Sequence, residues 1–532
     1  MNIVNRPGII RTGHPPKRLS IAATVIVAAM LVPVIYLIIR TIGVGSEIFE
    51  LLWRQRTFEI VTNSILLMLA VSCASVLIAV PIGWLTTKTD LPFRRAFSVA
   101  TVLPLVIPSY VGGFVLVIAL GPKGILQGWL SNIGVERLPE IYGFPGAMLT
   151  LTLLTYPYVL LPVRSALQRL DPSLDEASHA LGKGSYETFL RITLPMLRPS
   201  IAAGTILVAL YTISDFGAVS LLHYETFTWA IYIQYGNFAR DMAASLSLVL
   251  VAIAISLLIA ETRTRGKARY YRNATGLPHP HKLIRLGNWK WPAMALCSSV
   301  VIFSLLIPIS VLVYWVVRGL AAGEQISLPW DHIENTLFVA VAAALTTVIA
   351  SIPIAMLSVR YPSYISTLLE RLSYVGFALP GIVVALAMVF FGIRYAAPLY
   401  QTTTLLIFAY MVLFLPAALG NVRASLVQIS PVIEQAARIL GKSPSQVFTT
   451  ITLPLLISGI LAGSIMVFML TMKELPATLI LSPIGFQTLA TSIWSATEDV
   501  FFAKAAAPAL LMILLSSIPM GIIVWLGREE VS

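Results

Sequence analysis

The chain has 532 residues, of which 57% are hydrophobic and only 11% are charged. Soluble domains carry roughly 25% charged residues, so this composition excludes a free soluble enzyme and a disordered chain and indicates an integral membrane protein. The net charge of +12 comes from Lys and Arg in short stretches between apolar segments, which is typical of cytoplasmic loops rather than of a nucleic-acid-binding surface. Cys73 and Cys297 both lie inside apolar segments, so we expect two separate thiols.

Twelve apolar segments are long enough to cross a membrane, six on each side of a basic interval. They lie near residues 19–40, 60–86, 96–120, 147–165, 199–222, 242–260, 293–318, 336–358, 373–393, 403–422, 457–481 and 505–527. The first is longer than the core of a signal peptide, so we expect an uncleaved span. The sequence therefore predicts an all-α integral membrane protein with about twelve transmembrane helices.

Lys and Arg decide the predicted orientation. The N-terminus, the stretches around Lys88 and 164–198, and the interval 261–291 are all basic, and they are alternate loops of the predicted topology. The interval 261–291 carries eight Lys and Arg against one acidic residue, Glu261. Because cytoplasmic loops are enriched in Lys and Arg, both termini and this interval are predicted to lie in the cytoplasm.

The two halves of the chain repeat each other in sequence. With a shift of 259 residues, 14 of the 34 positions in 171–204 are identical to those in 430–463. Upstream, a shift of 272 residues aligns Asn63 with Asn335, and it likewise aligns Pro108 with Pro380. Because each half has an even number of spans, the six-helix repeats are predicted to be parallel rather than inverted.

The segment that repeats best is a polar stretch between the fourth and fifth spans of each half. Its local chemistry predicts a short helix, a turn and a second short helix. The first helix begins at an N-cap followed by proline and ends at a glycine, and the second begins with a capping box. These signals are Asp171-Pro172, Ser430-Pro431, Gly182, Gly441 and Ser443 to Gln446, and Pro195 and Pro454 are expected to end the second helix before the next span. Two stiff cytoplasmic helices in each half are better explained as a surface that docks on another protein than as a simple connector between spans.

These residues resemble the "EAA" loop of ABC importer permeases. The two copies are Asp175-Glu-Ala-Ser-His-Ala-Leu-Gly182 and Glu434-Gln-Ala-Ala-Arg-Ile-Leu-Gly441. In that family the loop docks in a cleft of a cytoplasmic ATPase subunit. The resemblance implies a type I importer permease fold and a coupling role for Asp175, Glu176, Ala177, Gly182, Glu434, Ala436, Ala437 and Gly441.

A narrower resemblance, to the fused permeases of bacterial ferric iron importers, lies downstream of each loop. It is carried by Ser214 to Val219, Thr226 to Tyr232, Lys473 to Thr478 and Gly485 to Thr491. It implies a multi-pass protein of the bacterial inner membrane that receives Fe³⁺ from a periplasmic iron-binding protein and works with two copies of an ABC ATPase. Fused thiamine and phosphonate permeases are relatives, so another small solute is the alternative substrate.

The resemblance also implies the domain organisation. Residues 1–18 form a cytoplasmic tail, 19–260 the first repeat with its coupling loop at 171–195, 261–291 a cytoplasmic linker, 292–527 the second repeat with its coupling loop at 430–454, and 528–532 a second tail.

The chain itself lacks the motifs of an ATPase. Gly441-Lys442-Ser443 matches the end of a phosphate-binding loop, but the glycine that this loop requires five residues earlier is Ala436, and no strand is predicted before it. We therefore expect no catalytic residues and no cofactor on this chain, with ATP and Mg²⁺ bound by the partner ATPase.

Apart from arginines at the span ends, three charged residues fall inside the predicted spans, namely Asp215, Lys473 and Glu474. Charge in a span is costly and commonly functional. Asp215 and Glu474 occupy the same repeat position, and Gly217 and Pro476 follow two residues later, so both helices are expected to break there.

Oxygen donors suit a hard cation such as Fe³⁺, so these carboxylates are candidates for the substrate pathway and for metal ligation, with Tyr110, Tyr156 and Tyr211 as further pathway candidates. The alternative is structural, with Glu474 neutralised by Lys473 and Asp215 capping a broken helix. A secondary transporter would also contain repeats, but it would not need two docking loops.

Overall fold

The computed structural model describes residues 15–44, 53–122, 124–131, 134, 139–265, 283–324 and 329–529. Within these residues the regular structure is helical, apart from one isolated β-bridge between Thr89 and Ile284. In the described part of the chain, ten helices are long and apolar enough to cross a membrane, or up to twelve if two bent helix pairs each form one span. The predicted all-α membrane architecture is therefore confirmed. The predicted tail residues 1–14 and linker residues 266–282 lie outside the described part of the chain.

The helices pack into two compact units, and the first-repeat unit comprises Phe49–Ser327 and Ala496–Met520. Its helices are α4 (Gln55–Lys88), α5 (Arg94–Ala100), α6 (Ser109–Leu120), α7 (Ile125–Leu130), α8 (Phe144–Thr155), α9 (Pro157–Arg169), α10 (Pro172–Ala180), α11 (Ser185–Thr188), α12 (Leu194–Ser214), α13 (Gly217–Leu221), α14 (Phe227–Gly236), α15 (Arg240–Arg265), α16 (Lys290–Val301), α17 (Ile307–Ala321) and most of α27 (Phe502–Glu529). Helices α4, α9 and α12 form its centre. Gly204 of α12 allows this packing, because a Cβ there would lie 2.6 Å from the Cα of Val159 on α9.

The second-repeat unit comprises Met1–Ile48, Leu328–Ser495 and Gly521–Ser532. Its helices are α1 (Lys17–Met30), α2 (Val32–Val44), α18 (Trp330–Arg360), α19 (Tyr364–Ser373), α20 (Gly381–Tyr395), α21 (Thr403–Gln428), α22 (Pro431–Ile439), α23 (Pro444–Val447), α24 (Leu453–Met472), α25 (Pro476–Leu481) and most of α26 (Leu489–Glu498). Helices α18, α21 and α24 form its centre, as their counterparts α4, α9 and α12 do in the other unit. Gly463 faces the Cα of Ala418 here, and both residues are shifted by 259 from Gly204 and Val159.

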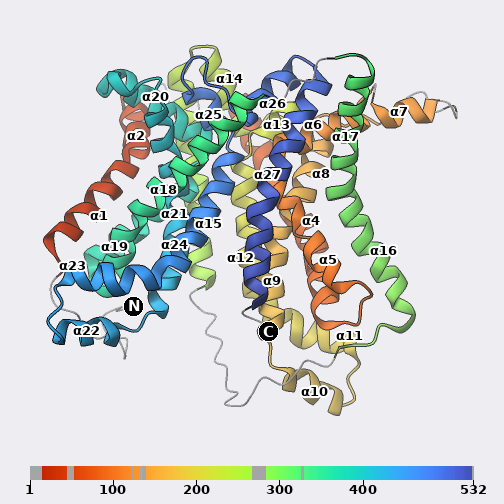
Figure 1. Ribbon diagram of the computed structural model, residues 1–532. Coiled ribbons are helices and arrows are strands. Elements are labelled where there is room, and N and C mark those ends of the chain that lie inside the picture. The colour runs from red at the N-terminus through yellow and green to blue at the C-terminus, as the bar shows by residue number, and fades with distance from the viewer. Residues whose placement is uncertain are drawn as a thin grey trace. The chain divides into compact units, whose positions relative to one another are not determined.

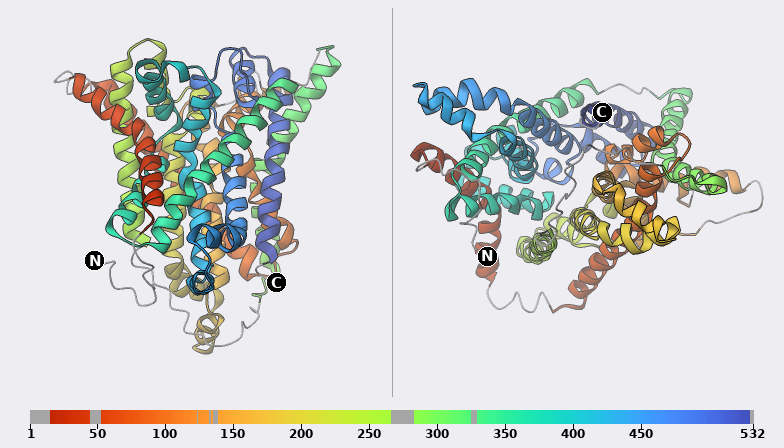
Figure 2. Two further views of the ribbon diagram at one scale, coloured as in Figure 1. Left: turned by 60° about the vertical axis from the view of Figure 1, so that its left-hand side comes forward. Right: turned by 90° about the horizontal axis from the view of Figure 1, so that it is seen from below.

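The first helices of each sequence half pack with helices of the other half. Helix α1 packs on α18 and α19, and α2 packs on α20 (Figure 2). Helices α16 and α17, which begin the second half of the sequence, instead pack on α4, α5 and α6. The packing units therefore differ from the sequence repeats, and the predicted repeat boundaries 19–260 and 292–527 stay a prediction.

The third predicted span of each half is not one continuous helix. In the first half α5 is followed by a short 3-10 turn (Leu103–Val106), and α6 begins only after Pro108. In the second half the helix Tyr364–Ala378 and α20 are separated at Pro380 and meet at 106°. Proline has no N–H to donate and restricts the residue before it, so the backbone at both prolines is extended. The aligned prolines found in the sequence thus mark breaks rather than kinks.

Candidate functional site

The two coupling loops, 171–195 and 430–454, form helical projections at one end of their own units. Helices α10 and α11 extend beyond the ends of α9 and α12, and α22 and α23 lie at the corresponding end of α24 (Figure 1). The predicted N-caps are present: the Asp171 carboxylate accepts a hydrogen bond from the Ser173 N–H at 3.0 Å, and the Ser430 hydroxyl accepts one from Val432 at 3.4 Å. Ser443 forms the predicted capping box with Gln446. The helix starts are therefore fixed by local sequence.

The first helix of each loop ends as predicted, at a glycine with a left-handed backbone. The φ angle is +77° at Gly182 and +87° at Gly441. The next N–H in each loop, from Lys183 or Lys442, returns to a carbonyl five residues earlier. This is the Schellman ending, which reverses the chain within about two residues and directs the second helix back toward the membrane.

The expectation that Pro195 and Pro454 end the second helix is wrong. Helix α11 continues through a π-helical turn (Phe189–Thr193) into α12, and the stretch Ser185–Ser214 is one helix of 30 residues. The second half repeats this, with a π-helical turn (Phe448–Thr452) leading into α24. The wide π-helical turn already interrupts the regular i→i−4 hydrogen bonds just before the proline, so the N–H that proline lacks is accommodated without ending the helix.

The tip of each coupling loop exposes apolar side chains beside its terminal glycine. Leu181 is 80% exposed and its repeat counterpart Leu440 is 84% exposed. Ile439 and Tyr186 are exposed as well. A cluster of exposed large apolar side chains on a polar connector marks a surface for protein contact. Sequence reasoning did not use these leucines, although their identity in both repeats was the available signal.

Five of the eight predicted coupling residues are exposed and two are buried. The exposed ones are Glu176, Ala177, Gly182, Ala436 and Gly441. Glu434 and Ala437 are buried, and the side chain of Asp175 lies outside the described part of the chain. Glu434 thus turns inward and contacts Arg360 of α18 instead of facing out.

The two loops hold their helices together with different chemistry at the same positions. In the first loop, the buried hydroxyls of Ser178 and Thr188 share a hydrogen bond of 2.8 Å. In the second loop the counterparts are Ala437 and Val447, both buried. A hydrogen-bonded pair and an apolar pair of similar size are equivalent ways to close a helical hairpin.

The helix that contains Asp215 breaks as predicted. Helix α12 ends at Ser214, Asp215 is extended, and α13 begins at Gly217. The buried Asp215 carboxylate accepts a hydrogen bond from the Ala218 N–H at 3.0 Å, and the Thr228 hydroxyl donates to the Asp215 carbonyl. Asp215 therefore holds the start of α13. This is the structural role that the sequence offered as the alternative to a place in the substrate pathway.

Glu474 occupies the same place in the second half. Helix α24 ends at Met472 and α25 begins at Pro476. The Glu474 carboxylate accepts a hydrogen bond from the Ala477 N–H at 3.2 Å. It also lies against the first residue of α20, since a Cβ on Gly381 would sit 2.1 Å from its Oε1. The partial positive charge of a helix start favours a carboxylate there.

The three tyrosines predicted for the pathway lie in the first-repeat unit. Tyr110 and Tyr156 are buried, and their hydroxyls donate to Met512 Sδ at 3.0 Å and to the Thr101 carbonyl at 2.7 Å. Tyr211 is half-buried, and its ring lies 5.6 Å from that of Tyr158. Two of the three thus serve packing in this conformation. Within the part of the chain that the structure describes, no three His, Cys, Asp or Glu gather to hold a metal ion.

In each half, an asparagine and the hydroxyl residue that follows it bind the loop beyond the helix break. The sequence showed only that Asn63 and Asn335 align. Asn63 Nδ2 donates to the Glu225 carbonyl at 3.2 Å, and Asn335 Nδ2 donates to the Gln487 carbonyl at 2.9 Å. The next residue in each half, Ser64 or Thr336, accepts from an N–H at the start of α14 or α26. These "Asn clamps" fasten the chain that follows each broken helix to the long helix α4 or α18.

Two repeated helical halves, each with an apolar-tipped loop and a carboxylate at a broken helix, define a multi-pass membrane permease. The family model of binding-protein-dependent transport system inner membrane components matches residues 79–261 and 347–530, once in each half. The chain belongs to this family.

Curated relatives agree with the family. The chain is 36% identical over 511 residues to the Fe(3+)-transport system permease protein FbpB 2 of Haemophilus influenzae, which covers 95% of this chain and 97% of the relative. It is 25% identical to the ferric transport system permease protein FbpB of Actinobacillus pleuropneumoniae, over 88% of this chain and 71% of the relative. The molybdenum transport system permease protein ModB of Escherichia coli is 32% identical, but over 29% of this chain and 69% of that protein.

Proposed function

We propose that this chain is the transmembrane subunit of an ATP-driven importer that takes Fe³⁺ from a periplasmic binding protein and releases it into the cytoplasm by alternating access. The nearly full-length similarity to a permease named for Fe(3+) transport supports this substrate more strongly than the partial similarity to a molybdenum permease. The match of both halves to a binding-protein-dependent family supports the delivery route.

The observation that carries the docking role is the exposure of Leu181 and Leu440 at equivalent loop tips. Each loop contacts one copy of a cytoplasmic ABC ATPase, so two copies bind, and ATP and Mg²⁺ reside on those partners. Because the docking loops lie in the cytoplasm, both termini and the basic linker are placed there too, in agreement with their Lys and Arg. The membrane is the bacterial inner membrane.

Asp215 and Glu474 are proposed to line the pathway of the cation, each in its own half. Charge inside a span is commonly functional, and hard cations prefer the oxygen ligands that carboxylates offer. Holding the break and attracting the cation are compatible roles for the same group. Among the three tyrosines, Tyr211 is the stronger pathway candidate, since the hydroxyls of Tyr110 and Tyr156 are bound to Met512 and to the Thr101 carbonyl.

The test is reconstitution of the chain with its ATPase and iron-binding protein in sealed vesicles, followed by uptake of ⁵⁵Fe. We expect uptake that requires ATP and the loaded binding protein. Uptake of thiamine, phosphonate or molybdate in place of iron would refute the substrate, and uptake driven by an ion gradient without ATP would refute the importer mechanism.

A further inference from the structure

The coupling helix α22 buries an acid, Glu434, although most of its side chains are exposed or half-buried. Glu434 is 5% exposed, whereas its neighbour Ile433 is 47% exposed and Ile439 at the helix end is 86% exposed. Carboxylates are rarely buried unless they are paired, because removing the charge from water is costly. The burial of Glu434 therefore calls for a specific partner.

That partner is Arg360, the last residue of the long span helix α18. Its Nε lies 3.1 Å from both carboxylate oxygens of Glu434, and its Nη2 lies 3.0 Å from Oε1. Nη2 also donates to the Ile429 carbonyl, at the end of α21, at 3.0 Å. The Thr452 hydroxyl, in the π-helical turn before α24, donates to Glu434 Oε1 at 3.1 Å. One ion pair thus joins α22 to the ends of all three central helices of its unit.

We propose that the Arg360–Glu434 pair is the mechanical link between the second coupling loop and the spans, so that a displacement of α22 by the ATPase is passed to α18, α21 and α24. This inference rests on the proposed importer function. A buried ion pair contributes little net stability compared with an apolar pair of the same size, but its directed hydrogen bonds fix one orientation. The planar guanidinium is suited to this, since it holds a carboxylate at two points.

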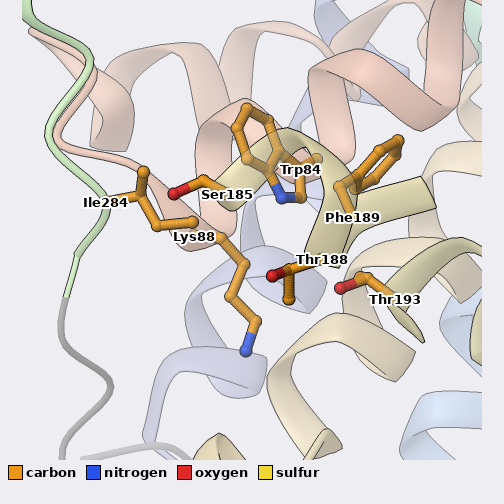
Figure 3. Close-up of a pocket in the computed structure, with 7 residues that line it drawn as sticks. All are labelled: Trp84, Lys88, Ser185, Thr188, Phe189, Thr193 and Ile284. Atoms are coloured by element: carbon orange, nitrogen blue, oxygen red, sulfur yellow. The ribbon is translucent and has the colours of Figure 1, made fainter. Parts of the chain in front are cut away.

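The first half places a different cation at the position of Arg360. Lys88 stands at the position of Arg360 under the shift of 272, at the end of α4, and it is buried. It lines a small cavity against the π-helical turn, with Thr188, Phe189 and Thr193 (Figure 3). Thr193 is the counterpart of Thr452. A lysine presents one charged nitrogen rather than a planar fork, so it does not hold a carboxylate at two points as Arg360 does.

Replacing the pair by apolar residues distinguishes a role in transmitting motion from a purely structural role. Glu434→Gln leaves the guanidinium buried without its counter-charge, so it should lower thermal stability as well as coupling. Arg360→Met combined with Glu434→Leu keeps the volume and removes both charges, so it should restore stability without restoring the orientation. The matched control is Arg423→Met with Glu370→Leu, because that pair also joins two helices of this unit, at 2.9 Å, without contacting a coupling loop.

The first measurement is amide hydrogen exchange of the assembled complex in lipid. We expect the amides of residues 433–439 in the apolar pair variant to exchange roughly tenfold faster than in the wild type, because α22 loses the directed hydrogen bonds that hold it to the spans although the apolar pair keeps the global stability. The control variant should leave these amides unchanged. Unchanged exchange in the apolar pair variant would overturn the inference, whatever the complex transports.

The second measurement is the number of iron ions imported per ATP hydrolysed. The apolar pair variant should hydrolyse ATP but import several-fold fewer ions per ATP, while Arg360→Lys should keep part of the coupling because it keeps the charge. Wild-type stoichiometry in a variant with accelerated exchange would show a structural pair and overturn the link. A wild-type complex that imports no iron refutes the proposed substrate alone, and the link then stands or falls on the exchange of α22.

Discussion

Replacing Gly441 with alanine should misdirect the second coupling loop through the backbone alone. Gly441 has φ +87°, and a Cβ built on it meets no atom within 4 Å, so the new methyl group has room. The cost is therefore conformational: an L-residue in the left-handed region costs about 1–2 kcal/mol. The lower backbone entropy of alanine in the unfolded chain offsets about 0.4–1 kcal/mol of this. We expect a net loss of roughly 1 kcal/mol, or about a fivefold smaller population of the native helix end.

The matched control is Gly420→Ala. Gly420 lies inside α21, where a Cβ also meets no atom within 4 Å, but its backbone is helical. Alanine is preferred to glycine in a helix by about 1 kcal/mol, so this variant should be stabilised. Gly441→Asn should fall between wild type and Gly441→Ala because asparagine tolerates the left-handed region. Gly441→Pro should be the most severe, since proline cannot adopt a positive φ and removes the N–H that bonds the Arg438 carbonyl at 3.0 Å.

The assay is ATP hydrolysis by the reconstituted complex, with and without loaded binding protein, beside the thermal stability of the same samples. The order of stimulation should be wild type, Gly441→Asn, Gly441→Ala and Gly441→Pro, with insertion into the membrane unaffected because no span is altered. If Gly441→Ala and Gly420→Ala change stability in the same direction, the left-handed helix end is not the reason that glycine is needed. Full stimulation of Gly441→Pro would refute the docking role of the loop.

Three further changes test other parts of the site. Asp215→Asn should preserve thermal stability, since an amide oxygen still accepts the Ala218 N–H, but it should lower ⁵⁵Fe uptake; Asp215→Ala should also lose about 1 kcal/mol of stability. Asn63→Ala should cost about 1 kcal/mol and speed amide exchange at the start of α14, because the Glu225 carbonyl loses its donor. Ser178→Ala alone should destabilise the first loop by about 1 kcal/mol in thermal unfolding, whereas Ser178→Ala with Thr188→Val should be close to neutral.

The features that sequence predicted correctly are those fixed by a few neighbouring residues. The helix starts at Asp171 and Ser443, the left-handed glycines and the break beyond Asp215 all follow from side chains within four positions of the feature. The same local reasoning failed at Pro195. A proline usually ends a helix because it lacks an N–H and clashes with the preceding turn, and here a π-helical turn just before Pro195 accommodates it, so the helix continues.

The contacts that sequence did not predict join residues far apart in the chain. Arg360 and Glu434 are separated by 74 residues, and Asn63 reaches a carbonyl 162 residues away. Local pattern carries no information on such pairs. The repeat did contain a signal for the Arg360–Glu434 pair. A cation recurs at the end of the second span in both halves, as Lys88 and Arg360, and burying a charge there is costly unless it has a partner.

At several equivalent positions, the two halves make the same kind of contact with different side chains. A hydroxyl pair at Ser178 and Thr188 becomes an apolar pair in the second loop, and a lysine becomes the arginine fork at Arg360. At the helix breaks, the room for the contact comes from Gly217 beside Tyr110 in one half and from Gly381 beside Glu474 in the other. Each place keeps its geometric task while the residues that perform it differ. The two coupling loops therefore share their left-handed helix ends, whereas the side chains that hold each loop together differ between the halves.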